Sequence, residues 1–591
     1  MKDLLKYPFN NSAILRKRKA IRRELIKESI TRKLKVAILG GSTTSELINV
    51  IELFLLNQGF LATFYESEYN KFFEDAVFDN PKLLAFNPDI IYIHTTHHNI
   101  NEYPSLLASN EEVETIFQSE ISKFRNIWTS LEKYNCPIIQ NNFDLPINRS
   151  LGNLDCYDVH GKSYFLNRLN HAFHKQAQYN KSLYINDINH LSALIGLNSW
   201  HDKNLWFTAK YAVSFDAIPS LGNNIVGIIL AIFGGSKKCL VLDLDNTCWG
   251  GVIGDDGLNG IKLGNESPSG EAYMKFQNYV KELKQRGIIL AVSSKNENLI
   301  AKEAFTHSDS VLSFEDFTSF KANWNPKYIN INKIADEINI GLDSLVFIDD
   351  NSMERNIVES QLPSVSVPDV GNNILDFIDF IEGNNYFETV NLSIDDINRN
   401  RFYSENRKRA NQESTFKNYE EFLFSLNMKA EINPFTSIYT ERITQLINKT
   451  NQFNLTTKRY QLAEIEMISL SKKFISLYGK LNDKFGDNGL ISVVIGELIE
   501  ETCIIDTWLM SCRVLKREME FAMLDKLVQA CKVLEIKKII GVYKPTTKNK
   551  MVSKLFSDFE FTFIEKNDKG DMFWELEISN YIQKQISIKY K

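Results

Sequence analysis

The chain lacks any hydrophobic run long enough to cross a bilayer. Its longest, Ile225–Phe233, is nine residues, against the roughly 20 that a span needs. The N-terminus lacks the apolar stretch of about 7–15 residues that a secretory signal carries. The seven cysteines form no CxxC pair, which argues against a disulfide framework or a cysteine zinc site. The formal net charge of −6 lacks the basic surplus of a nucleic-acid binder. We therefore expect a cytoplasmic protein that binds neither nucleic acid nor membrane.

The 591 residues are enough for three or four domains, at about 100–200 residues each. Residues 1–34 predict a basic helical arm, either a docking segment for an acidic partner or, as we favour, a helix packed along one face. Strands alternating with helices over 35–235 and 236–385 predict two α/β domains with parallel sheets. A charged helical linker is expected at 386–420. Residues 421–591 combine antiparallel-looking strands with a long helix, which predicts an α+β domain.

The strongest chemical signal lies in the second α/β domain, in the stretch CLVLDLDNT. Four apolar residues predict a buried strand, and Asp243 and Asp245 follow at its carboxyl end, where open α/β sheets bind ligands. Two carboxylates so close together repel each other, and a divalent cation with its preference for oxygen ligands relieves that repulsion. Thr247 lies two residues further on.

Three later segments place polar side chains in comparable positions. One apolar strand runs into Ser294, whose hydroxyl can hydrogen-bond a phosphoryl oxygen without adding charge. Lys327 stands at a predicted helix start in NWNPK, where its ammonium can neutralise an anion beside the positive end of the helix. Another apolar strand ends in Asp349 and Asp350, a second acidic pair that completes a metal cup.

The order of acid pair, hydroxyl, lysine and acid pair, over about 110 residues, resembles the haloacid dehalogenase (HAD) superfamily. The resemblance implies that the four loops converge at the carboxyl edge of one parallel, Rossmann-like sheet. It implies that Asp243 is the nucleophile that forms an aspartyl-phosphate and that Asp245 is the general acid and base. The remaining implied assignments are Ser294 and Lys327 for the transferring oxygens, Thr247 and Asn296 for substrate, and Asp243, the Asp245 backbone carbonyl, Asp349 and Asp350 for Mg²⁺.

Two assignments stay open because the segments offer alternatives. Ser293 could replace Ser294, and Lys321 could replace Lys327. The matching family motifs, SKN and NWxPK, favour Ser294 and Lys327. Little chain separates Thr247 from the second motif, so we expect a minimal cap and a site that admits a large or carrier-tethered substrate.

The wording of the motifs narrows the resemblance. DLDNTCWGGVIGDDG, SSKN, NWNPK and FIDDN are similar to the FkbH-like branch of the superfamily, a phosphatase of the IIIC type. That branch implies removal of phosphate from a phosphorylated glyceryl donor, bisphosphoglycerate, and loading of the glyceryl unit onto a phosphopantetheinylated acyl carrier protein. It also implies an SGNH-hydrolase-like first domain and an acetyltransferase-like (GNAT) last domain. A plain sugar- or polyol-phosphate phosphatase and a non-catalytic assembly module are the competing functions.

The last domain departs from the branch in SCRVLKRE, where Lys516 and Glu518 replace two glycines of a phosphate-approaching loop. Binding of free coenzyme A is therefore doubtful. Cys512 is the candidate for an acyl-carrying thiol because basic residues flank it, although a buried structural thiol is the stronger interpretation. Arg513 could bind an acidic carrier or a pantetheine phosphate. Cys248, behind the acidic motif, is interpreted as a packing residue.

The first domain permits an esterase hypothesis that we do not favour. A triad would need Ser42 as nucleophile, His190 or His201 as base, and Asp187 or Asp202 as its partner. A serine that only caps a helix explains the same residues, so we favour a degenerate docking or substrate-binding domain. His97 and His98 are interpreted as surface histidines rather than zinc ligands.

Overall fold

The computed structural model describes residues 2–28, 30, 32–546 and 548–590. The chain forms two compact units, one ending at Leu230 and one beginning at Ala231. The boundary falls inside a single helix, α10 (Ile218–Ile232). Across the described residues, no helix combines the length and the apolar character that a membrane-spanning segment requires.

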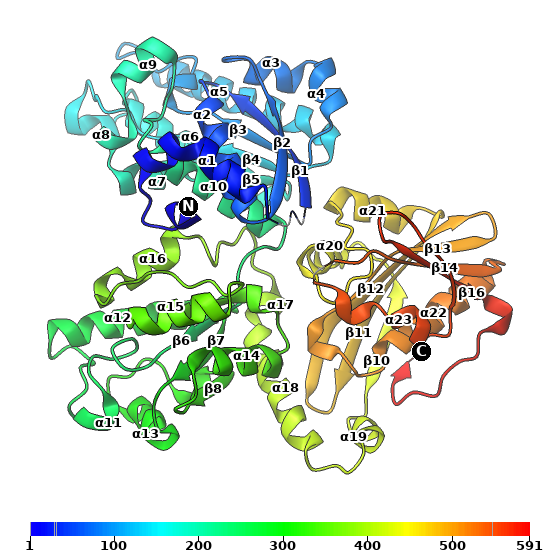
Figure 1. The fold of residues 1–591 in the computed structure, drawn as a ribbon. Coiled ribbons are helices and arrows are strands. Elements are labelled where there is room, and N and C mark those ends of the chain that lie inside the picture. Colours follow the sequence, from blue (N-terminus) through cyan, green and yellow to red (C-terminus); the bar gives the residue numbers. More distant parts are fainter. Residues whose placement is uncertain (1, 29, 31, 547, 591) are drawn as a thin grey trace. The chain divides into compact units, whose positions relative to one another are not determined.

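The first unit is built on a five-stranded parallel sheet in the order β2-β1-β3-β4-β5, with helices around it (Figure 1). One face is covered by α3, α5 and α6, whose apolar side chains form a shared core with β1, β3 and β4. The strands are β1 (Arg32–Gly40), β2 (Phe60–Glu66), β3 (Ile90–His94), β4 (Ile138–Asn141) and β5 (Leu183–Asn186). The helices before α10 are α1 (Asn11–Leu25), α2 (Ser45–Asn57), α3 (Phe72–Val77), α4 (Pro81–Phe86), α5 (Asn110–Leu131), α6 (Lys162–Tyr179), α7 (Ile188–Ile195), α8 (Leu197–Trp200) and α9 (Lys203–Ala209).

The basic N-terminal segment is shorter as a helix than the expected arm. Helix α1 ends at Leu25, and residues 32–34 already belong to β1. Its apolar positions, Ile14 and Ile21 among them, are fully buried, while Arg22 forms an ion pair of 2.8 Å with Glu52 of α2. The helix is therefore packed along one face.

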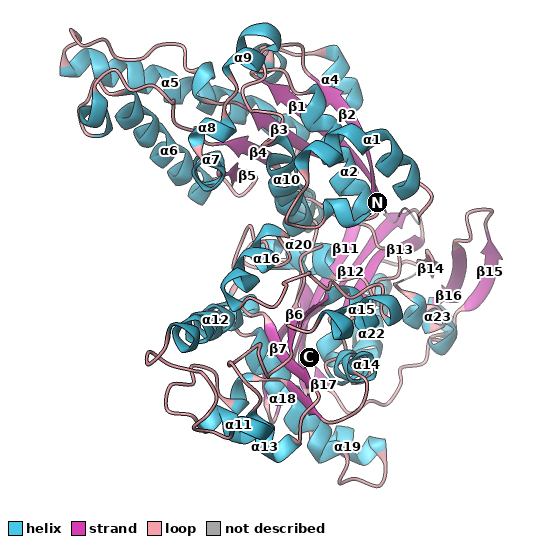
Figure 2. Cartoon of the chain, turned by 60° about the vertical axis from the view of Figure 1, so that its left-hand side comes forward, coloured by secondary structure: helices cyan, strands magenta, loops and turns pink. Residues whose placement is uncertain are grey.

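The central domain is a four-stranded parallel sheet in the order β8-β7-β6-β9, covered by helices on both faces (Figure 2). Alternate residues of β6 point into the two cores: Leu240 and Leu242 face α12, whereas Cys239 and Val241 face α14 and α15. The strands are β6 (Cys239–Leu242), β7 (Ile289–Ser294), β8 (Ser319–Ala322) and β9 (Leu345–Ile348). The helices are α11 (Ile253–Asp256), α12 (Pro268–Gln285), α13 (Asn298–Glu303), α14 (Lys327–Glu337), α15 (Ser352–Gln361) and α16 (Phe377–Gly383).

The last domain is an α+β fold on an eight-stranded sheet in the order β15-β16-β14-β13-β12-β11-β10-β17. Neighbouring strands are antiparallel except β13–β14 and β10–β17. The strands are β10 (Lys429–Pro434), β11 (Phe474–Asp483), β12 (Gly486–Ile499), β13 (Thr502–Met510), β14 (Lys538–Tyr543), β15 (Thr562–Lys566), β16 (Met572–Glu577) and β17 (Lys589–Tyr590). The helices are α19 (Tyr419–Ser425), α20 (Thr440–Lys449), α21 (Leu462–Leu470), α22 (Met519–Val533) and α23 (Leu555–Asp558).

The segment expected as a linker contributes to packing as well. It contains α17 (Ile394–Ile397) and α18 (Arg399–Glu413). Tyr403 of α18 is buried in the core of the central domain, and Arg409 of the same helix makes two 2.8 Å contacts with the buried Asp483 of β11. Helix α18 therefore packs its side chains against both domains and is more than a covalent connection between them.

Candidate active site

The register of the central sheet brings three chain segments to one edge. Leu242 of β6 pairs with Val292 of β7 and with Ile348 of β9, all in parallel. The residues that follow these strands therefore leave the sheet side by side at its carboxyl edge. Asp243 and Asp349 are two of them, and the Asp243 N–H donates to the Ile348 carbonyl at 2.9 Å.

Lys327 lies among these strand ends because it begins helix α14 directly after Pro326. Its side chain is only 3% exposed, and its Nζ lies 2.8 Å from Asp243 Oδ2 and 2.6 Å from Asp349 Oδ2. Burial alone would lower the pKa of Lys327, but the two carboxylates outweigh it and raise the pKa above its ordinary value. Lys321, the alternative lysine, pairs instead with Glu337 of α14 at 2.5 Å.

The carboxylates form a cluster whose negative charge Lys327 does not balance. Oxygens of Asp243, Asp349 and Asp350 all lie within 4.8 Å of one another. Asp243 Oδ1 is buried and has no hydrogen-bond partner. Burial and then the neighbouring Asp243 raise the pKa of Asp349 well above its ordinary value. Three carboxylates and one ammonium leave an excess of negative charge that a divalent cation can balance, and an all-oxygen donor set fits Mg²⁺.

The Asp245 carboxylate is held by its own set of hydrogen bonds. Its Oδ1 accepts from Trp249 Nε1 at 2.9 Å and from the Ile253 N–H at 3.0 Å, and its Oδ2 accepts from Asn296 Nδ2 at 2.8 Å. Burial raises the pKa of Asp245, against the lowering by the Ile253 and Trp249 hydrogen bonds. A held carboxyl with a raised pKa is suited to donate a proton and take it back.

The hydroxyl candidates differ in whether they already have a partner. Ser293 Oγ donates to the Lys327 carbonyl at 3.4 Å. Ser294 is the last residue of β7 and is buried. Its hydroxyl makes no hydrogen bond to the residues that the structure describes. Thr247 Oγ1 is buried without any partner. Ser294 and Thr247 therefore keep their hydroxyls available for a ligand.

Arg355 of α15 is a residue that sequence reasoning missed. Its Nη1 donates to the carbonyls of Asp349 and Asp350 at 2.7 and 2.8 Å, and its Nη2 contacts Asp369 at 2.6 Å. The guanidinium thus fixes the backbone of the second acidic pair. No motif marks it, because a single arginine on a helix carries no recognisable pattern.

The chain between Thr247 and β7 adds no domain over the site. Before α12 begins at Pro268, it holds α11, which is one turn of helix, and an antiparallel bridge from Gly250 to Lys262. The Cys248 side chain is fully buried next to Asp243, and its Sγ donates to the Asp243 carbonyl at 3.3 Å. Burial raises the pKa of this thiol, as expected of a packing residue.

Cys512 lies at a different place in the second unit. It lines a cavity of about 430 Å³, together with Lys238, which precedes β6, and Ser344, which precedes β9. Both mark the amino-terminal edge of the sheet, whereas Asp243 is at the carboxyl edge. Four residues of strand, about 13 Å at 3.3 Å per residue, separate the two edges. Cys512 and the carboxylate–lysine cluster are therefore separate sites.

Charged side chains dominate the Cys512 cavity. Arg513 lies over the Phe402 ring at 4.3 Å, and Tyr403 Oη lies 3.8 Å from Cys512 Sγ. The cavity is lined by six cationic residues and three acidic ones: Lys238, Arg399, Arg442, Lys449, Arg513 and Lys548, with Asp343, Asp395 and Asp396. The surplus of cations suits an anionic ligand.

The two residues that replace glycines retain the backbone shape that glycine would supply. Lys516 has φ 64° and Glu518 φ 63°, both in the left-handed region.

The segment around Leu455 lies between the carboxyl ends of β13 and β14. The Leu455 N–H donates to the Trp508 carbonyl at 3.0 Å, and its carbonyl accepts from the Lys544 N–H at 2.9 Å. The chain itself thus fills the space between these two strands.

The structure does not assemble the triad considered for the first domain. Ser42 Oγ is buried and has no hydrogen-bond partner. Asp187 accepts from the His190 backbone N–H as the cap of α7, and Asp202 caps α9. Helix capping takes up both carboxylates, which is why neither serves a catalytic histidine. The carboxylate beside His201 is instead Asp144, which sequence reasoning missed.

Fold and site together define a multidomain α/β protein with a carboxylate–lysine site at the carboxyl edge of its central parallel sheet. A family model described as FkbH, N-terminal domain, matches residues 35–230. A solved structure of the N-terminal part of protein BF1531 from Bacteroides fragilis, containing a phosphatase domain complexed with Mg, is 33% identical, with a TM-score of 0.58. The match covers 63% of this chain and 99% of that one. The chain therefore belongs to the family of the Bacteroides protein, and its first domain is similar to the FkbH N-terminal domain.

Other similarities concern the last domain. The ribosomal-protein-S18-alanine N-acetyltransferase from Escherichia coli is 8% identical, with a TM-score of 0.20, over 25% of this chain and 94% of that one. The PaiA N-acetyltransferase from Thermoplasma acidophilum, in complex with coenzyme A, is 13% identical over 25% of this chain and 99% of that one, with a TM-score of 0.20. No curated protein matches the chain.

Proposed function

We propose that the central domain is a Mg²⁺-dependent phosphatase in which Asp243 is the nucleophile. The observation that carries the proposal is the environment of Asp243: its Oδ2 pairs with Lys327, whereas its buried Oδ1 has no partner. A carboxylate held on one side and open on the other is suited to attack phosphorus. The phosphatase domain of the Bacteroides relative supports the same chemistry.

The residues divide the reaction between them. Asp243 attacks phosphorus, the bond from phosphorus to the leaving oxygen breaks, and Asp245 donates a proton to that oxygen. In the second half Asp245 takes a proton from water, which attacks the aspartyl-phosphate and releases inorganic phosphate. Lys327 and Ser294 hold the transferring oxygens, while Asn296 keeps Asp245 oriented through their 2.8 Å hydrogen bond.

Asp243, Asp349 and Asp350 are the residues that would hold Mg²⁺. When bound, the ion offsets the charge of the phosphate and of the carboxylates around it. The chain fits this role because its three carboxylates converge with one oxygen left unpartnered.

The finer proposal is that the substrate is a phosphorylated glyceryl donor whose glyceryl unit passes to an acyl carrier protein. The separation of the Cys512 cavity from the phosphatase site supports it, because bisphosphoglycerate carries an acyl phosphate and a phosphate ester that need different chemistry. At Cys512 a sulfur–carbon bond would form, the acyl carbon–oxygen bond would break, and inorganic phosphate would leave while the thiol proton passes to water. The ester phosphate would be removed at Asp243 beforehand, because a glyceryl unit already bound to Cys512 is too short to reach across the sheet. The carrier's thiol would finally take the glyceryl group from Cys512 by thioester exchange.

The test measures phosphate release and adducts on the same samples. The full chain is incubated with bisphosphoglycerate and a phosphopantetheinylated carrier, and inorganic phosphate and intact mass are followed. Asp243→Asn is expected to abolish release of the ester phosphate, and chelation of Mg²⁺ to do the same reversibly. Lys321→Met is the matched control for Lys327→Met, because only the latter removes a side chain from the site.

The outcomes separate the two levels of the proposal. An Asp243→Asn protein that releases the ester phosphate at the unchanged rate contradicts the phosphatase assignment. A glyceryl adduct that appears on the carrier and is lost in Cys512→Ser supports the transfer step. Release of phosphate without an adduct on the chain or on the carrier favours a plain phosphatase of sugar or polyol phosphates.

A further inference from the structure

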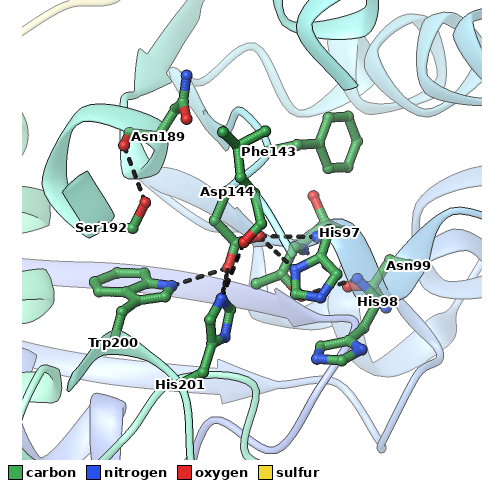
Figure 3. A network of polar contacts seen from close by, with 12 residues as sticks. His97, His98, Asn99, Phe143, Asp144, Asn189, Ser192, Trp200 and His201 are labelled. Carbon is green, nitrogen blue, oxygen red and sulfur yellow. Dashed lines mark hydrogen bonds and ion pairs between the residues drawn. The ribbon is translucent and has the colours of Figure 1, made fainter. Parts of the chain in front are cut away.

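Three histidines converge in the first unit, although the sequence predicted two of them to be ordinary surface residues. His97 and His98 follow β3, and His201 follows α8 (Figure 3). One ring nitrogen of each lies within 4.8 Å of the others. The centroids of the His97 and His98 rings are 4.0 Å apart, and those of His97 and His201 are 5.1 Å apart. His201 thus lies next to two histidines that precede it by about a hundred residues in the sequence.

A buried carboxylate holds this cluster from behind. Asp144 is fully buried, and its Oδ1 accepts from the backbone N–H of His97 at 2.9 Å and lies 3.0 Å from His97 Nδ1. Its Oδ2 accepts from Trp200 Nε1 at 2.9 Å (Figure 3). Burial alone would raise the pKa of Asp144, but His97 and His201 together with these hydrogen bonds lower it below its usual range. An anionic Asp144 makes His97 Nδ1 the donor, so Nε2 carries the free lone pair.

The other two rings are also held in place. His201 Nε2 lies 3.1 Å from the Leu145 carbonyl, which can only accept, so the proton sits on Nε2 and the lone pair on Nδ1. The His98 ring stacks on Trp206 at 3.8 Å with 11° between the planes. Burial, followed by repulsion from His97, lowers the pKa of His98 to about 3, so this ring is neutral near pH 7.

We propose that His97, His98 and His201 bind a divalent transition-metal cation of the Zn²⁺ class, with Asp144 as the carboxylate that orients His97. Three imidazole nitrogens are the donor set that such cations prefer, whereas the all-oxygen set of the central domain suits Mg²⁺. A histidine ligand whose second nitrogen donates to a carboxylate is the usual arrangement of zinc sites. Zn–N bonds of 2.0–2.1 Å place tetrahedral nitrogens about 3.4 Å apart. One ring nitrogen of each histidine already lies within 4.8 Å of the others, which is close to this spacing.

The number of protein ligands determines whether such a site has an open coordination position. Three protein ligands leave one tetrahedral position, which water or an anionic or carbonyl group can take. The first unit therefore has a place for metal-assisted binding that uses neither Ser42 nor the capping carboxylates. This inference does not depend on the proposed function of the central domain.

The test is a Zn²⁺ titration of the metal-stripped full chain against a chromogenic chelator, with excess Mg²⁺ present. The unaltered chain is expected to bind one more tight equivalent of Zn²⁺ than His98→Ala or His201→Ala. Asp144→Asn is expected to weaken that equivalent by roughly 10–100-fold, because it removes only the orienting carboxylate. His174→Ala, at an exposed histidine of α6, is the matched control and should bind as the unaltered chain does.

A second readout covers the possibility that a variant misfolds. Co²⁺ is added in place of Zn²⁺, and the visible absorption of tetrahedral cobalt is expected only when all three histidines are present. His98→Gln is used if His98→Ala changes the hydrogen exchange of β3. Equal Zn²⁺ uptake by the unaltered chain and a folded His98 variant overturns the proposal, as does an equal loss in His174→Ala.

Discussion

Replacing Lys327 by methionine isolates the electrostatics of the central site. The ammonium lies 2.8 Å from Asp243 and 2.6 Å from Asp349, and both carboxylates are buried with it. Methionine keeps most of the volume and removes the charge. The three carboxylates of the cluster are then left without a cation, so we expect the central domain to lose stability in Mg²⁺-free buffer.

The size of the expected loss in stability follows from two opposing contributions, the attraction between the charges and the desolvation of the ammonium. At an effective dielectric constant of 20, charges at these distances attract by about 6 kcal/mol per pair. Desolvation of the ammonium offsets much of this gain, and removing one partner of a buried ion pair costs about 3–5 kcal/mol in measured cases. We expect a loss in that range. Without the ammonium, the three carboxylates should bind Mg²⁺ more tightly, so a fixed Mg²⁺ concentration should stabilise the variant more than the unaltered chain and reduce the difference in stability. Mg²⁺ at a hundred times its dissociation constant contributes about 2.7 kcal/mol.

Hydrogen exchange of the full chain, read on peptides from β6 and β9, measures the local free energy of opening. Lys321→Met is the matched control, because its 2.5 Å pair with Glu337 is partly exposed and is expected to contribute at most about 1 kcal/mol. Equal losses in the two variants, or a Lys327 loss that Mg²⁺ leaves unchanged, would refute the reasoning.

Three further predictions concern stability elsewhere in the chain. Lys516→Gly should stabilise the last domain by about 0.5–1 kcal/mol, because the exposed lysine has φ 64°, whereas the same change at the exposed helical Lys532 should destabilise it. Arg409→Met should cost about 3 kcal/mol, because it leaves the buried Asp483 with Arg517, at 3.2 Å, as its one ion-pair partner among the described residues. Burial lowers the pKa of His94 to about 4, below the roughly 6.5 of an unfolded chain, so the unfolded state binds more protons between these values. Stability of the first unit should therefore fall as pH drops from about 6.5 to 4, by up to about 3 kcal/mol, and less in His94→Gln.

The same exchange measurement checks all three. A destabilised Lys516→Gly would contradict the argument from left-handed backbone. Arg401→Met is the control for Arg409, because the Arg401 side chain is exposed and lies 3.7 Å from Glu405. An equal loss in both variants would contradict the burial argument. A pH profile that His94→Gln leaves unaltered would assign the acid sensitivity to another group.

The carboxylate–lysine cluster could be anticipated because each of its members follows a strong local signal. Buried strands announce themselves by short apolar runs, and polar residues directly after parallel strands must meet at one edge of the sheet. Asp243, Lys327 and Asp349 follow this rule. This rule did not decide between Lys321 and Lys327, because both lysines lie near the same helix. Only the packing of α14 brings Lys321 into its ion pair with Glu337.

Local pattern failed where function depends on partners far along the chain. Strand β5 was not anticipated, because its LYIN is short and only partly buried. Cys512 carried no indication that it lies at the sheet edge opposite Asp243, since that depends on how the last domain packs around α18. The charged composition of α18 concealed the burial of Tyr403 for the same reason.

The amino-acid sequence by itself determined the three sheet-based domains and the residues that meet at the carboxyl edge of the central sheet, because both depend on local periodicity and strand order. Only the tertiary structure decided that three histidines converge, that His97 and His201 share the Asp144 carboxylate, and that Cys512 and Asp243 lie at opposite edges of the central sheet. Those facts depend on long-range packing, in which a side chain's neighbours come from segments that share no local pattern.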